Sequence, residues 1–282
     1  MADIKLKASK APNLPIPTIS YSQTYTESFS NALRLYFNTL DAFTINLSTV
    51  IGGSSLSFPY LSGLENGVTT LATNMSNVST TPIIVTSTAD FPSTGFIIIQ
   101  NEIIQFTGKT ATTFTGITRG VKGTTNLAHT APVAVTGAAG VAAGSLAAMN
   151  IDTVTASNGV TCTVPDSKIY FEQTGFYNIQ FSAQFLNYTT SEDNITIWIR
   201  KNGTDVPYSA GIQQINASHA SLPGSTIAGW NYVDPFVAGD YIEFYWASNT
   251  GNTVLATYPA GTSPVHPVAP SLIVTVTFVS RT

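Results

Sequence analysis

The sequence predicts a mainly β protein with one short N-terminal helix, and three observations support this fold class. Only 9% of the residues are charged and 11% are aromatic, while Thr, Ser, Asn and Gly are abundant, a composition typical of strands and turns. Short β-branched runs bounded by Gly, Pro or Asn recur from about residue 82 to the end, which favours a β-sandwich. Residues 24–47 alone have apolar residues at helical spacing.

Charge and cysteine content argue against several classes of protein. The formal net charge is −4 and the 11 basic residues are spread along the chain, so the basic patch of a nucleic-acid-binding protein is missing. Cys162 is the only cysteine, which excludes an intrachain disulfide and a thiolate metal cluster. The first residues are polar, and no run approaches the ~18 apolar residues of a membrane span. We therefore expect neither a signal peptide nor membrane insertion.

Residues 1–23 are predicted to form an extended N-terminal anchoring arm. The three prolines of the stretch APNLPIPTIS fix φ and remove backbone donors, which disfavours regular structure. Apolar residues alternate along the arm, and they are Leu14, Ile16 and Ile19. This alternation favours a strand-like tail that docks on a partner protein over a disordered terminus.

Residues 24–51 are predicted to contain a helix with an apolar seam. Thr24 and Glu27 have the spacing of a capping box. The seam has the alternating four- and three-residue spacing of paired helices, and it consists of Phe29, Leu33, Tyr36, Leu40, Phe43 and Leu47. A helix of ~33 Å is marginal in water without packing, so the seam must pack either on sister helices or on the chain's own β-structure.

The remaining boundaries follow composition and turn residues. The expected divisions are an extended connector at 52–81, a small β-module at 82–136, a Gly/Ala-rich linker at 137–149 and the sandwich at 150–282. Gln100, Asn101 and Glu102 are predicted to turn a hairpin inside the module. In the stretch NITIWIRKNG, Ile195, Ile197 and Ile199 are expected to face one side of a strand.

The sequence predicts no enzyme, no cofactor and no metal site. The histidines lie in turn-like segments without metal-ligand spacing and are interpreted as surface residues, namely His129, His219 and His266. Glu192 and Asp193 are adjacent in a segment expected to be a solvated hairpin, so they do not suit the paired carboxylates of a glycosidase. Asp240 is interpreted as a turn-capping aspartate rather than a calcium ligand.

Several motifs of the C-terminal part carry a resemblance to a known family. The stretches FEQTGFYNIQFSAQF, IRKNG, FVAGDYIEFYW and SLIVTVTF occur in this order. They resemble the jelly-roll head shared by tumour-necrosis-factor and complement-type globular domains, with one extra residue before the tyrosine. The residues that match are Phe171, Gly175, Tyr177, Asn202, Gly203, Gly239, Asp240 and Ile242. The resemblance implies a jelly-roll fold and a homotrimer.

The rest of the chain is similar to virion proteins of marine tailed bacteriophages, notably those of cyanobacterial viruses. The similarity lies in NALRLYFNTLD, in FPY, in FPSTGFIIIQNEIIQFTGKTATTFTGITRGVKGT and in YPAGTSPVHP. Proteins of this kind are tail-fibre, head-fibre or decoration components. The resemblance implies a homotrimeric appendage on the phage particle surface, with the arm attached to other virion proteins of the tail, the neck or the capsid.

The expected function is therefore that of a non-enzymatic structural protein of a phage particle, a trimeric fibre or decoration subunit. The amide-rich loops QQINASHASLPGS and YPAGTSPVHPV favour contact between the head and a host-surface glycan or protein. Two alternatives remain open at this point. One is a secreted cytokine-like or complement-like receptor ligand, and the other is a carbohydrate-active tailspike.

Overall fold

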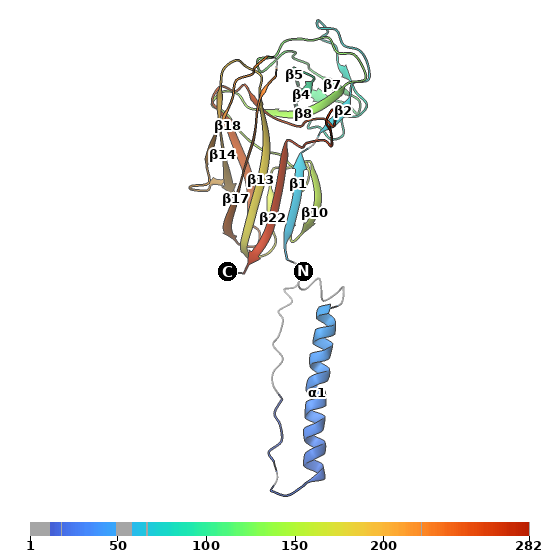
Figure 1. Cartoon of the computed structure of the whole chain (residues 1–282), viewed down its shortest axis with the longest axis vertical. Helices are drawn as coiled ribbons and strands as arrows, with labels where there is room; N and C mark the ends of the chain where they lie inside the picture. The colour runs from blue at the N-terminus through green and yellow to red at the C-terminus, as the bar shows by residue number, and fades with distance from the viewer. Residues whose placement is uncertain (1–11, 18, 49–57, 66, 221, 282) are drawn as a thin grey trace. The chain divides into compact units, whose positions relative to one another are not determined.

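The computed structural model describes residues 12–17, 19–48, 58–65, 67–220 and 222–281. The chain divides into two compact units, Met1–Phe58 and Pro59–Thr282, which are described separately (Figure 1). One helix and more than twenty short and long strands make up the described residues, which confirms the mainly β fold class.

The first unit contains α1, Gln23–Ser48. Ser22 caps this helix, because its Oγ accepts a hydrogen bond from the backbone N–H of Tyr25 at 3.3 Å. The predicted cap at Thr24 is therefore wrong, and Glu27 instead accepts a bond from the Gln23 side chain at 2.9 Å. The described residues of the arm before Gln23 form neither helix nor strand. Among the described helices, none is both long and apolar enough to cross a membrane.

The second unit is built on a β-sandwich of two antiparallel sheets. The first sheet has the order β10 (Thr153–Asn158), β1 (Tyr60–Glu65), β22 (Leu272–Ser280), β13 (Gly175–Asn187) and β17 (Gly224–Phe236). The second has the order β11 (Val160–Thr161), β12 (Ile169–Phe171), β18 (Tyr241–Ser248), β14 (Asp193–Lys201) and β16 (Gly211–Ile215). From β12 onward the long strands alternate between the two sheets, as in a jelly roll.

Alternating side chains fill the space between the two sheets. Ile195, Ile197 and Ile199 of β14 are buried, as their period of two predicts. They belong to one apolar cluster with Phe181 of β13 and Trp246 of β18. The expected sandwich is therefore confirmed, and its strands expose their other residues on two outer faces.

The small β-module is joined to the sandwich by a continuous sheet. Beyond β13 the first sheet continues through β19 (Thr253–Ala256), β8 (Ala134–Gly140), β4 (Gly95–Ile99) and β5 (Glu102–Phe106). The module also contains β2 (Val68–Thr70), β3 (Ile83–Ile84), β6 (Gly108–Lys109) and β7 (Thr113–Thr115). Figure 1 shows β4, β5 and β8 at the end of this unit that lies away from the start of β1. The module has a separate apolar core around Phe91, Phe106 and Phe114.

Two predicted connections are strands instead. The segment 137–149, expected to be a linker, contains part of β8 and all of β9 (Leu146–Ala148). The described part of the expected connector 52–81 contains β1 and β2. In β8 small residues allow close packing, because a Cβ on Gly140 would lie 3.1 Å from the Phe96 ring. Low complexity here therefore reflects a crowded strand between β4 and β19 rather than a flexible segment.

Candidate functional site

The main candidate for a binding site is a cavity of about 490 Å³ where the β-module meets the sandwich. This volume lies in the range of small-molecule sites. The two loops that the sequence singled out for host contact both reach this cavity. Its lining residues are Ile98, Gln100, Asn101, Val133, Ala134, Thr136, Leu186, Tyr188, Leu222, Pro223, Ser225, Thr257, Tyr258 and Pro259. None of these residues carries a charge, and we refer to this space as the interdomain cavity.

Two tyrosines give the interdomain cavity its aromatic character. Tyr188 and Tyr258 are both half-buried and pack against the buried cluster that contains Ile98 and Leu186. Burial raises the pKa of Tyr188, and the neighbouring Tyr258 raises it further. Burial also raises the pKa of Tyr258, although a hydrogen bond with the Ser225 side chain opposes this shift. Both phenols are therefore neutral hydrogen-bonding groups at physiological pH.

Gln100 lies at the rim of the interdomain cavity, and its side chain contacts the buried His129. It forms the two-residue turn between β4 and β5 together with Asn101, which confirms the predicted hairpin, and it has a φ of 56°. Its Oε1 lies 2.9 Å from Nδ1 of His129. The prediction that His129 is a surface residue is wrong, because its side chain is fully buried.

A buried ionic network, Glu102, Arg119 and His129, supports this turn. Arg119 donates from Nε to Oε1 of Glu102 at 2.5 Å and from Nη2 to Oε2 at 2.7 Å, which is a bidentate pair. His129 Nε2 lies 2.7 Å from the same Oε2. The remaining donors of Arg119 reach the backbone carbonyls of Ser76, Ser79 and Leu127. The network therefore ties the β2–β3 and β7–β8 connections of the module to the first residue of β5.

The network also sets the charge of Glu102. Burial alone would raise the pKa of this carboxyl, but hydrogen bonds from Arg119, the Leu127 backbone and His129 outweigh burial. The positive charge of Arg119 acts in the same direction, so the pKa lies below its ordinary value. Sequence reasoning missed this network, although a glutamate at the start of the apolar strand EIIQF was the signal that could have indicated a buried ion pair.

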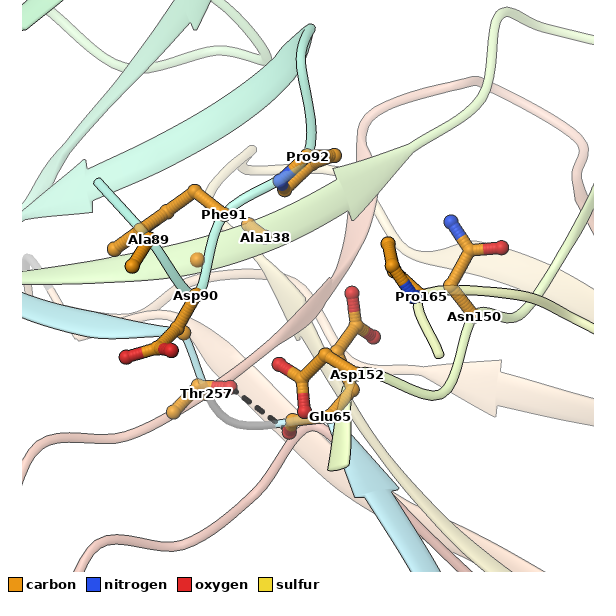
Figure 2. Close-up of a pocket in the computed structure, with 12 residues that line it drawn as sticks. Glu65, Ala89, Asp90, Phe91, Pro92, Ala138, Asn150, Asp152, Pro165 and Thr257 are labelled. Atoms are coloured by element: carbon orange, nitrogen blue, oxygen red, sulfur yellow. Dashed lines mark hydrogen bonds between the residues drawn. The ribbon is translucent and has the colours of Figure 1, made fainter. Parts of the chain in front are cut away.

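A second, acidic cavity of about 110 Å³ lies between the module and β1 (Figure 2). Figure 2 shows the side chains of Glu65 and Asp152 next to each other, and Asp90 also lines the space. Burial raises the pKa of Glu65 to about 7, a hydrogen bond with Ser271 opposes the shift, and the charge of Asp152 adds to it. The volume is below the range of ligand sites, so we interpret this acidic cavity as structural.

We expect Glu65→Gln to stabilise the protein at alkaline pH. The folded pKa of Glu65, about 7, exceeds its ordinary value of 4.5, so the stability that this group contributes is complete below about pH 4.5 and is lost as the pH rises to about 7. The amide stays neutral throughout. Because Glu65 is partly accessible through the cavity, we expect a gain of about 2–3 kcal/mol in the free energy of unfolding at pH 8 and little change at pH 4.

Urea denaturation at the two pH values measures this difference. Glu192→Gln removes one carboxylate at an exposed position and serves as the control for net charge. An equal gain at pH 4 and pH 8 would contradict a titrating Glu65.

The other carboxylates singled out in the sequence have structural surroundings. Asp193 is buried, contrary to the expected solvated hairpin, and accepts hydrogen bonds from the Ser248 and Thr253 hydroxyls at 2.6 Å each. Glu192 is exposed and accepts a bond from Gln214. Asp240 accepts a bond from the backbone N–H of Val237 at 2.9 Å, the arrangement expected of a turn cap. Within the described residues, no group of three His, Cys, Asp or Glu side chains has metal-binding geometry.

The structure brings the residues of the jelly-roll motif together at the end of the sandwich away from the module. Phe171 and Tyr177 pack edge to face with ring centroids 4.7 Å apart, and Gly239 donates from its backbone N–H to the Phe171 carbonyl. Asn202 donates to Asp240 at 2.7 Å. Gly203 completes the turn after β14, Ile242 pairs with Ile169, and Gly175 leaves room for the Phe278 ring. These contacts indicate that the motif stabilises the fold.

The structure describes the side chains of only part of the predicted helical seam. Phe29, Leu33, Tyr36 and Leu40 are all half-buried on one side of α1. The side chains of Phe43 and Leu47 lie outside the described residues. In the described part of α1 no side chain is fully buried, so the seam still presents apolar surface.

No family model matches the chain, and no curated protein matches it significantly.

Proposed function

We propose that this chain is a non-enzymatic structural subunit of a tailed bacteriophage particle. In this proposal three copies form a fibre or decoration on the virion surface, the N-terminal arm binds other virion proteins, and the C-terminal head contacts the host surface. The sequence resemblance to marine phage virion proteins and to trimeric jelly-roll heads supports the proposal, and so do the surface properties of the sandwich.

The proposed trimer is supported mainly by the composition of the outer face of strands β22, β13 and β17. Cross-strand register places the outward residues of these strands side by side. This outer face consists of Phe176, Asn178, Gln180, Ser182, Gln184, Ile227, Gly229, Asn231, Val233, Pro235, Ile273, Thr275 and Thr277. It carries no charge, it includes exposed apolar side chains, and the buried Oδ1 of Asn178 has no hydrogen-bond partner within the chain. Charged residues are depleted in the same way at interface centres.

The outer face of the second sheet differs in these respects. There the Arg200 guanidinium lies 4.0 Å from the centroid of the Tyr245 ring and pairs with Asp205 at 2.6 Å. Trp198 also donates from its indole N–H to Asp205 at 2.7 Å. This network pairs the charged groups of Arg200 and Asp205 within a single chain, so we assign the subunit interface to the uncharged face of the first sheet.

Light scattering on the full chain at micromolar concentration tests this assignment. We expect the mass of a trimer, and we expect Val233→Lys to lower it to the mass of a monomer because a charge would lie in the interface. Ile212→Lys, at an exposed β-branched residue of β16, is the matched control and should leave the trimer intact. A monomeric wild-type chain, or a Val233→Lys protein that remains trimeric, would contradict the assignment.

The virion and host parts of the proposal need separate experiments. Mass spectrometry of purified phage particles should detect the chain at a copy number divisible by three. Full-length protein added to host cells should bind them and reduce phage adsorption. Absence of the chain from particles argues against the virion role, whereas failure to bind cells argues against host contact alone.

A further inference from the structure

We propose that the interdomain cavity binds a neutral saccharide. This inference deepens the proposed host contact of the head and rests on it, because it assigns that contact to one site and one class of ligand. The cavity has room for such a ligand at about 490 Å³, and its mouth is formed by residues from both the module and the sandwich.

The floor and walls of the cavity suit the carbon–hydrogen faces of a sugar ring. Ile98 and Leu186 are buried beneath it, while the half-buried rings of Tyr188 and Tyr258 offer apolar surfaces that end in hydroxyl groups. Pro223 and Pro259 add flat apolar surface without backbone donors. A lining of this kind binds a ligand with both an apolar face and a polar edge.

The rim suits the hydroxyl groups of a sugar. Gln100, Asn101 and Ser225 are exposed there and provide amide and hydroxyl groups that both donate and accept hydrogen bonds. Gln100 is fixed before any ligand arrives, because the buried His129 holds its Oε1 at 2.9 Å and the two-residue turn holds its backbone. A group that is already ordered loses less entropy on binding, which favours affinity.

The absence of charge in the lining selects among ligand classes. The carboxylate or sulfate of a charged sugar would lose its hydration on entering this cavity. No cationic group of the lining would pair with it, so the desolvation would be costly. Lys122, Arg119 and His129, the cationic or ionisable groups of the neighbouring loops, are engaged with backbone carbonyls, with Glu102 or with Gln100. Neutral hexoses avoid this penalty, so we assign the site to them.

The test uses full-length protein with maltotriose, cellotriose, mannotriose and galactotriose as neutral probes and trigalacturonic acid as the charged comparator. Saturation-transfer NMR and calorimetry should show at least one neutral trisaccharide binding with a Kd of roughly 0.1–10 mM, which corresponds to about −5.5 to −2.7 kcal/mol. The charged comparator should bind at least about tenfold more weakly.

Variants then locate the binding. Tyr258→Ala should weaken binding about tenfold or more, and Tyr258→Phe, which keeps the ring, should weaken it less. Gln100→Ala should weaken it about fivefold. The matched control is Tyr208→Ala, because Tyr208 is fully exposed and is not part of the cavity lining, so binding should be unchanged. Near-wild-type thermal melting of each variant confirms that the fold is retained.

Two results of these binding measurements would overturn the proposal. One is no binding of any neutral probe at 50 mM, and the other is binding that Tyr258→Ala does not weaken. Because these measurements do not depend on the trimer, they are separable from the proposed virion role. If full-length Tyr258→Ala protein still bound host cells as the wild type does, host contact would stand and this site would be excluded.

Discussion

Replacing Arg119 by Met is expected to lower the free energy of unfolding by about 3–5 kcal/mol, the usual loss when one partner of a buried ion pair is removed. The Arg119 and Glu102 side chains are only 3% and 0% exposed. In the variant Glu102 would remain buried with the His129 contact and two backbone donors but without its bidentate partner. Three backbone carbonyls in two connections of the module would also lose the hydrogen bonds that Arg119 donates.

The loss of stability caused by Arg119→Met should depend on pH. The pKa of Glu102 is lowered in the folded chain, so its stabilising contribution is present above the ordinary value of 4.5 and is lost as the pH falls through the folded value. The loss caused by Arg119→Met should therefore be full at pH 7. It should shrink at pH 3, because a protonated Glu102 no longer needs a cationic partner.

Arg200→Met is the matched control for this experiment. Arg200 pairs with Asp205 through an Nε to Oδ1 contact of 2.6 Å, close to the 2.5 Å of the buried pair, but these side chains are 23% and 61% exposed. Solvent screens exposed pairs, so the control should change stability little. Denaturant unfolding of both variants measures the contrast. Equal losses from the two substitutions would show that burial does not set the contribution of the Glu102 pair.

The sequence predicted the sandwich well because its long strands alternate between core and surface over most of their length. Ile195, Ile197 and Ile199 show this clearly, since shifting any of them by one position would expose an apolar side chain. The hairpin at Gln100 and Asn101 was equally predictable, because two β-branched runs flank a two-residue turn. Both patterns involve residues close together in the chain, so they can be recognised in a single sequence.

The features that sequence reasoning missed depend on distant residues. His129 lies in a turn-like segment, and only its contact with Glu102, 27 residues away, makes it part of a buried network. The raised pKa of Glu65 depends on its burial and on the charge of Asp152, and a hydrogen bond with Ser271, which is 206 positions later, opposes the shift. Likewise, residues 137–140 of β8 are only Gly and Ala and lack the β-branched side chains that indicate a strand, and their neighbours β4 and β19 determine their structure.

Substitutions in the helical seam are expected to have the largest effect on assembly of the proposed trimer. Replacing both Leu33 and Leu40 by Asp should convert the proposed trimer into monomers. Truncating a buried leucine to alanine already costs about 2–5 kcal/mol, and a carboxylate adds the desolvation of its charge. A loss of about 5 kcal/mol per protomer lowers an association constant by more than three orders of magnitude.

Leu35→Asp provides the matched control on the same helix, because Leu35 is 65% exposed and lies outside the seam. Light scattering and denaturant unfolding together distinguish the two packing partners that the sequence left open. If the seam meets sister helices, the double variant loses mass in light scattering while the β-structure of its second unit unfolds as in the wild type. If the seam packs on β-structure of its own chain, the trimer persists and the unfolding midpoint falls instead. A double variant that matches Leu35→Asp in both measurements would mean that the heptad spacing has no role in packing.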